Sequence, residues 1–129
     1  MTETVVDASV LLKLVLEEDD SPAWRAWYER AILGGDRLVA PANLYAETGR
    51  VVQRRFPELS DEERRVVHGD LTADVALLDP SPDDDWDAAR DLEFFDALYL
   101  SAAQGRSLVT ADARMARAAR TRGVRVVEP

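Results

Sequence analysis

The chain has 129 residues, of which 47% are hydrophobic, and its formal net charge is -9 at pH 7. This length suits one globular domain with its own core, so we expect residues 1–129 to form a single domain. The sequence has no cysteine and one histidine, which excludes disulfides, thiolate metal sites and multi-histidine sites. No apolar run reaches the length of a membrane span, and the N-terminus lacks the features of a secretion signal, so we expect a soluble, cytoplasmic protein with no membrane partner.

Charge is unevenly distributed along the chain. Acidic residues gather at 17–20 and 83–87, whereas the last third carries several arginines. The negative total weakens non-specific binding to nucleic acid. The total charge does not fix the local charge, however, so one basic surface remains compatible with this composition.

The N-terminal third predicts one strand followed by two helices. A β-branched run ends at Asp7, and a helical pattern begins at Ser9. Ser21 with Pro22 forms a helix start, because serine caps the first turn and proline is tolerated there. The glycines at 34–35 end this second helix.

The rest of the chain alternates in the same way. Residues 37–41 form a strand, a helix from about 42 to 56 stops at Pro57, and Ser60 with Glu63 makes a capping box for the next helix. The remaining predicted elements are a strand at 75–79, a helix from Ser81 and Pro82 to about 92, a helix at about 96–104 closed by Gly105, a strand at 107–110, a helix ended by Gly123, and a strand at 124–127. This alternation predicts the α/β class, with a central, mainly parallel five-stranded sheet and helices on both faces.

Two aspartates stand at the ends of predicted strands. Asp7 follows the first strand and Asp112 follows the fourth, with Thr110 two residues earlier. Ligand sites of open α/β sheets lie outside the carboxyl ends of the strands, so both positions suit a site. The alternative is that each aspartate only caps the helix that follows it.

Two further acids lie on apolar helical stripes. Glu47 has Leu44 and Val51 at neighbouring helical positions, and Asp96 is followed at helical spacing by Tyr99 and other apolar residues. An unpaired charge on such a face is costly. The alternatives are an ion pair of Glu47 with a nearby arginine, Arg50 or Arg54, and a favourable interaction of Asp96 with its helix dipole. Asn43, four residues before Glu47, could supply a neutral oxygen to the same place.

If the fold brings these four carboxylates together, they repel one another unless a cation neutralises them. Hard oxygen ligands suit Mg²⁺ or Mn²⁺, and enzymes that use them in this way act chiefly on phosphate esters. The sequence therefore predicts a metal site. Its predicted ligands and catalytic residues are Asp7, Glu47, Asp96 and Asp112.

With these motifs in order, the chain resembles the PIN-domain family, and within it the VapC-type toxins of toxin–antitoxin systems. The resemblance rests on the segments VVDASVLLKL, PANLYAE, FFDALYLSAA and LVTADARMARAA, which extend from about Val5 to Ala119. It implies a compact α/β fold and a metal-dependent endoribonuclease that cleaves RNA. It also implies a dimer and neutralisation by a small cognate antitoxin. Ser9 and Thr110 fit the small hydroxyl residues that accompany the first and fourth acids in this family.

One feature of the family pattern is incomplete. Some members carry a further acid just beyond the fourth one, whereas residues 113–116 here are Ala, Arg, Met and Ala. A fifth ligand is therefore not indicated, and the number of metal ions stays open between one and two.

The same residues do not match two other aspartate-rich α/β classes. A haloacid-type phosphatase would need Asp-x-Asp after the first strand, and a receiver domain would need paired acids there; neither pattern is present. Two alternatives remain open: a PIN-fold nuclease that acts on DNA or structured RNA outside a toxin system, and a non-catalytic PIN-like binding module.

Two smaller expectations concern side chains outside the acid set. The spacing of Trp24, Trp27 and Tyr28 on one helical face favours packing in the core. His68 lies in a charged helical stretch, which favours a solvated surface position.

Overall fold

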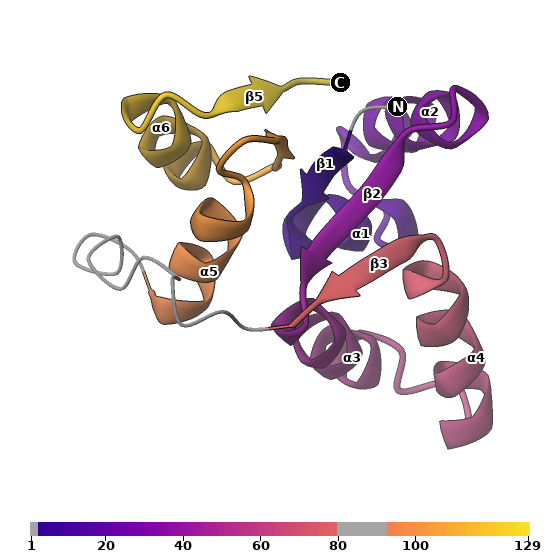
Figure 1. Ribbon diagram of the computed structural model, residues 1–129. Coiled ribbons are helices and arrows are strands. Elements are labelled where there is room, and N and C mark those ends of the chain that lie inside the picture. Colours follow the sequence, from indigo (N-terminus) through magenta and orange to yellow (C-terminus); the bar gives the residue numbers. More distant parts are fainter. Residues whose placement is uncertain (1–2, 80–92) are drawn as a thin grey trace.

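The computed structural model describes residues 3–79 and 93–129 as one α/β domain (Figure 1). A five-stranded, entirely parallel sheet has the strand order β3-β2-β1-β4-β5. The strands are β1 (Glu3–Val6), β2 (Arg37–Pro41), β3 (Val75–Leu78), β4 (Ser107–Val109) and β5 (Arg125–Val127). The helices are α1 (Ala8–Val15), α2 (Ser21–Leu33), α3 (Asn43–Arg55), α4 (Asp61–Thr72), α5 (Phe94–Ala102) and α6 (Ala113–Thr121). The predicted fold class is confirmed.

The order of the strands reverses direction at the centre of the sheet. From β1 the chain builds outward through β2 to β3, then returns to the other side of β1 to add β4 and β5. Because such crossovers are right-handed, the helices of the two halves cover opposite faces. In Figure 1, α5 and α6 lie on one side of the molecule and α1 to α4 on the other. The pair β1 and β4 is therefore the topological switch point of the sheet, where ligands of such folds bind.

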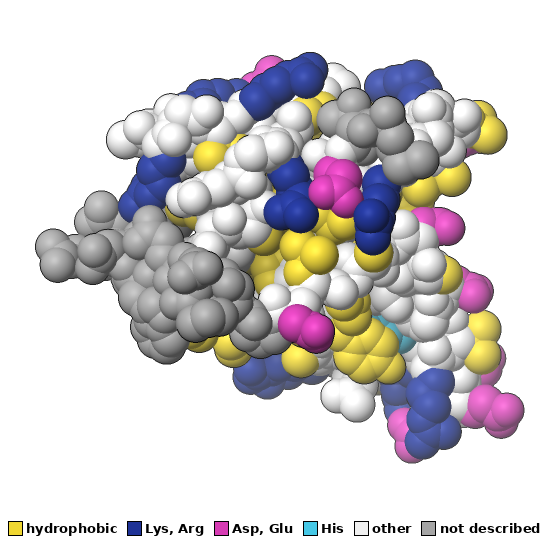
Figure 2. Space-filling model, in the orientation of Figure 1, with side chains coloured by type: hydrophobic (Ala, Val, Ile, Leu, Met, Phe, Trp, Pro, Cys, Tyr) yellow, Lys and Arg dark blue, Asp and Glu magenta, His cyan; other side chains and the backbone are white. Residues whose placement is uncertain are grey.

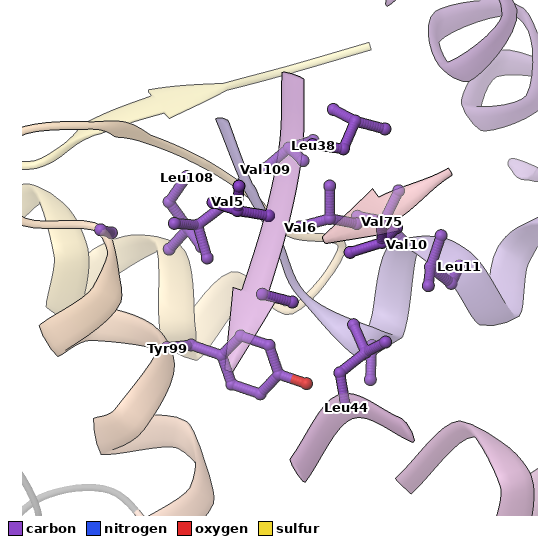
Figure 3. Close-up of a cluster of buried hydrophobic side chains, with 14 of the residues drawn as sticks. Val5, Val6, Val10, Leu11, Leu38, Leu44, Val75, Tyr99, Leu108 and Val109 are labelled. Carbon is purple, nitrogen blue, oxygen red and sulfur yellow. The ribbon is translucent and has the colours of Figure 1, made fainter. Parts of the chain in front are cut away.

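The central strands are buried on both faces, so their residues are continuously apolar rather than alternating. Val5 and Val6 of β1 and Leu108 and Val109 of β4 are completely buried. Figure 3 shows these side chains packed together with residues of β2 and the neighbouring helices. This core fixes the positions of β1 and β4, and thus the points at which the chain leaves the sheet after each of them.

Several sequence-based predictions about the helices are confirmed. Trp24 and Trp27 are buried and pack edge to face, with ring centroids 6.4 Å apart. Gly105 and Gly123, which follow α5 and α6, adopt positive φ values that glycine tolerates best. The predicted helix at 82–92 lies outside the described residues. In the described part of the chain, no helix is both long and apolar enough to cross a membrane.

The expectation for His68 is wrong, because the side chain is buried between α3 and α4. Its Nε2 lies 2.9 Å from Thr48 Oγ1, and its ring lies against Gly49, where an added Cβ would come within 3.1 Å of Cε1. Burial lowers the pKa of His68, so the ring is neutral at pH 7. The charged residues of α4 lie on its other faces, and the single histidine occupies the buried one.

The capping box at the start of α4 provides a direct test of the local structure. Ser60 Oγ accepts a hydrogen bond from the Glu63 backbone, and Glu63 Oε1 accepts one from the Ser60 backbone. We expect Ser60→Ala to lower the free energy of unfolding by about 1 kcal/mol, because it leaves a helix N–H group without its partner. Chemical denaturation measures this loss. Ser60→Asp is the control, which retains a capping oxygen; an equal loss in both variants would contradict the assignment.

Candidate metal centre and active site

Asp7 occupies the switch point of the sheet. Its backbone N–H donates to the Val109 carbonyl oxygen at 3.0 Å, which continues the pairing of β1 with β4 by one residue. Its side chain is only 6% exposed, and Oδ2 accepts hydrogen bonds from Ser9 Oγ at 2.7 Å and Thr110 Oγ1 at 2.8 Å. Although Asp7 is at the N-cap position of α1, its side chain makes no capping hydrogen bond. The capping alternative for Asp7 is therefore wrong.

The two hydroxyl groups beside Asp7 also hold the loop that follows β4. Ser9 Oγ accepts from the Ala111 backbone at 2.9 Å, and Thr110 Oγ1 accepts from the Asp112 backbone at 3.1 Å. Each hydroxyl group thus accepts a hydrogen bond from the backbone and donates its single proton to the Asp7 carboxylate. This network joins α1 to the start of α6. It fixes Asp7 as an acceptor of two hydrogen bonds.

The environment of Asp7 opposes ionisation overall. Burial raises the pKa of its carboxyl group, the hydroxyls of Ser9 and Thr110 lower it, and the charge of Asp112 raises it again. The net result is that the pKa of Asp7 lies above the ordinary value of an aspartate. A cation near this carboxylate would favour the charged form that the two hydroxyl groups are arranged to bind.

Asp112 caps α6, as the alternative reading of the sequence suggested. Its Oδ1 accepts hydrogen bonds from the backbone of Arg114 at 2.9 Å and of Met115 at 3.3 Å. The side chain is exposed. Capping does not remove Asp112 from the acid group, because its charge raises the pKa of both Asp7 and Asp96.

Glu47 projects from the second turn of α3 toward the same edge of the sheet. Its Oε2 accepts hydrogen bonds from Asn43 Nδ2 at 2.7 Å and from Tyr99 Oη at 2.9 Å. Asn43 points to the same place as predicted, but it contacts Glu47 through its amide nitrogen, so its role as a neutral oxygen donor stays a prediction. The alternative of an ion pair with Arg50 or Arg54 is wrong for the described residues, where the partners of Glu47 are neutral donors.

Tyr99 contacts the candidate site through Glu47, a place that the sequence did not assign to it. It is completely buried in α5, and its hydroxyl is directed toward the part of the core where Leu44 of α3 lies (Figure 3). Burial and the charge of Glu47 raise the pKa of Tyr99, so its hydroxyl stays protonated and donates to Glu47. The sequence pattern places Tyr99 only among the apolar residues that follow Asp96 on one helix face. Its polar atom, three residues after an acid on the same helix face, was the available signal.

Asp96 lies in the first turn of α5 and is half-buried. The described residues provide no hydrogen bond to its carboxylate. Burial, followed by the charges of Asp7, Asp112, Glu47 and Glu93, raises the pKa of Asp96 to about 6. The negative charge of each of the other three predicted acids therefore raises the pKa of Asp96. The structure brings all four into one electrostatic group at the carboxyl edge of the sheet.

The donor set fits a hard divalent cation in charge and atom type, since it offers carboxylate oxygens from four elements around the switch point. Within residues 3–79 and 93–129, however, no three acid or histidine side chains are already arranged as ligands of one ion. Protein hydrogen bonds occupy one oxygen each of Asp7, Glu47 and Asp112. Without a cation, mutual repulsion also favours separation of the carboxylates.

Comparisons with known proteins identify the fold and the family. A comparison with curated protein sequences gave no significant match. Among solved structures, the chain is similar to the crystal structure of PAE2754 from Pyrobaculum aerophilum, with 25% sequence identity and a TM-score of 0.69. The alignment covers 98% of this chain and 84% of that one. The sequence family described as PIN domain matches residues 4–121, nearly the whole chain. The chain therefore belongs to the PIN domain family, whose members are generally nucleases that use divalent metal ions.

Proposed function

We propose that this protein is a metal-dependent endoribonuclease and a VapC-type toxin. The observation that carries the proposal is the group of four acids at the switch point, in which Asp7, Asp112 and Glu47 all raise the pKa of Asp96. Such a concentration of negative charge is costly for a protein that binds a polyanion, unless a cation accompanies it. Membership of a family of nucleases supports the same reading.

The proposed ligands of Mg²⁺ or Mn²⁺ are Asp7, Glu47, Asp96 and Asp112. When bound, such an ion activates a water molecule and stabilises the charge that develops on the phosphate during hydrolysis. At Asp96 such an ion would meet a carboxylate to which no described residue donates a hydrogen bond. Asp112 is exposed at the rim, where it can orient a water molecule, although its Oδ1 also serves α6.

The remaining polar residues position these ligands. Ser9 and Thr110 hold Oδ2 of Asp7, and their hydrogen bonds favour the ionised carboxylate against the larger effect of burial. Asn43 and Tyr99 orient Glu47 from two different helices. Residues that orient metal ligands in this way commonly affect metal affinity by 10- to 100-fold.

The toxin assignment rests on the resemblance of the four acidic segments to VapC-type proteins. In this proposal the protein acts on RNA in the cytoplasm, forms a homodimer, and is neutralised by a small cognate antitoxin that blocks the acid group. Two alternative functions remain to be distinguished from this proposal by experiment. One is a non-catalytic binding module, and the other is a nuclease that acts on DNA or structured RNA.

Expression of the protein without an antitoxin tests the proposed activity in cells. We expect growth arrest with RNA cleavage for the unchanged chain and normal growth for Asp7→Asn, because the amide cannot supply the anionic ligand. The two proteins must accumulate to equal levels. Equal growth and intact RNA in both cultures would refute the toxin function and favour the binding module.

Cleavage assays with purified protein distinguish RNA from DNA as the substrate. We expect Mn²⁺-dependent cleavage of single-stranded RNA that EDTA abolishes, and a loss of at least about 100-fold in Asp96→Asn, because transition-state stabilisation by the ion is worth several kcal/mol. DNA of the same sequence is the parallel substrate. Cleavage of DNA at an equal or higher rate would contradict the ribonuclease assignment.

Tyr99→Phe tests the positioning of Glu47. The variant retains the buried ring but loses the hydrogen bond to Oε2, so we expect the Mn²⁺ concentration for half-maximal cleavage to rise by about tenfold. Saturating Mn²⁺ should restore most of the rate. Tyr28→Phe, which removes a hydroxyl group elsewhere in the fold, is the matched control. A Tyr99→Phe protein with unchanged metal dependence would exclude this role.

The raised pKa of Asp96 predicts how stability depends on pH. Between pH 4 and 6 the folded protein holds a proton on Asp96 that the unfolded chain releases, so the metal-free protein should lose stability as pH rises through this window. Asp96→Asn should show a smaller loss. Thermal melts at pH 4, 6 and 8 measure the difference, and Mn²⁺ should stabilise the unchanged protein more at pH 8 than at pH 4. Parallel pH curves for both proteins would contradict the prediction.

A further inference from the structure

A second feature of the molecule is a groove between α3 and α4, away from the sheet. It has a volume of about 530 Å³, within the range of pockets that hold small ligands. Among the residues that line it are Tyr45, Gly49, Arg50, Arg64, Arg65 and His68. Nothing in the proposed metal chemistry uses these residues.

The groove is locally basic on a protein of strongly negative net charge. Three arginines line it, whereas its only acidic lining residue is Asp61, so their formal charges sum to two positive. Arg64 is engaged by Asp61 and by the carbonyl oxygens of Phe56 and Leu59. Arg50 has no hydrogen bond or ion pair with the residues that the structure describes, and Arg65 interacts there only with the charge of Asp61. Both side chains are exposed and can meet a ligand.

An aromatic ring lies along the same groove. The Tyr45 side chain is 54% exposed, and its ring centroid is 4.4 Å from that of His68. His68 is itself fixed by Thr48 and by close contact with Gly49. Because Thr48 Oγ1 donates its proton to the Leu44 carbonyl oxygen, Nε2 of the neutral histidine must donate to Thr48. The Tyr45 ring thus packs at a tilt of 52° against a fixed histidine, while more than half of Tyr45 remains exposed to solvent.

The groove begins close to the acid group. Arg50 follows Glu47 by three residues on α3, which corresponds to about 5 Å along the helix axis and a neighbouring position on its surface. In Figure 2 the edge of the histidine is visible beside an exposed hydrophobic side chain, and basic side chains lie below it in the view. A strand that is bound at the acids can therefore continue into the groove without crossing the protein.

We propose that the groove between α3 and α4 binds the single-stranded RNA that flanks the cleaved bond, with a base stacked on Tyr45 and phosphates on Arg50 and Arg65. The combination of basic side chains with an exposed aromatic ring is how proteins bind single strands without reading their sequence. This inference rests on the proposed ribonuclease function. It adds a binding surface for the part of the RNA that extends beyond the four acids.

Substrate length provides the test. Cleavage of a dinucleotide and of a 12-nucleotide single-stranded RNA is compared in the unchanged protein, in Tyr45→Leu, and in the double variant Arg50→Gln with Arg65→Gln. The advantage in kcat/KM of the longer RNA over the dinucleotide should fall by about tenfold in each variant, mainly through KM. In the double variant, the dependence of binding on salt should also decrease, by about 0.7 in slope for each lost phosphate contact.

The matched control is the double variant Arg122→Gln with Arg125→Gln, which removes the same charge at the far end of the chain. It should retain the length advantage and the salt dependence. All variants must show the same circular dichroism spectrum and melting temperature. An unchanged length advantage in the groove variants, or an equal loss in the control, would overturn the proposal.

A binding measurement separates this inference from the proposed activity. Fluorescence anisotropy of the labelled 12-nucleotide RNA is recorded with Asp96→Asn, alone and combined with the groove substitutions. Weaker binding with the groove substitutions is expected whether or not the protein cleaves RNA. If the unchanged protein cleaves no RNA while the groove substitutions still weaken binding, the ribonuclease function fails and the groove assignment stands. Equal binding by both proteins would overturn the groove assignment alone.

Discussion

The mutual repulsion of carboxylates at one edge of the sheet is the constraint on which the organisation of this protein depends. Asp7 is buried where β1 and β4 separate, and Asp112, Glu47 and Asp96 approach it from other elements. A buried acid in an apolar surrounding would ordinarily be protonated. Here, two hydroxyl groups donate to the carboxylate and so favour the ionised form that the proposed cation would need.

The topology of the sheet accounts for the meeting of these residues. Parallel strands place all their carboxyl ends on one edge, and the reversal of direction between β1 and β4 marks the point on that edge where ligands of such folds bind. The N-terminal halves of α3 and α5 reach the same edge, since each helix leads back toward the start of a later strand. Residues separated by about a hundred positions thus share one hydrogen-bond network, as Ser9 and Thr110 do through Asp7.

The site also shows that a structural and a chemical role can coexist in one residue. Asp112 caps α6, yet its charge raises the pKa of two other acids. Glu47 is held by neutral donors on α3 and α5 rather than by an arginine, so its negative charge is oriented without being neutralised. Arg50, which follows Glu47 by three residues on α3, is part of the groove beside α4. Opposite charges are thereby kept on neighbouring but separate surfaces.

The sequence by itself determined the α/β alternation, the capping box at Ser60 and the identity of the four acids, because periodicity, caps and misplaced charges are local signals. Only the tertiary structure decided which contacts those residues make. It distinguished Asp7, which does not cap its helix, from Asp112, which does, and it joined Tyr99 to Glu47 across 52 residues. It also buried His68 against Gly49 and Tyr45. The physical reason is that pairing between elements depends on the order of the strands and the packing of the helices, which no local window of sequence contains.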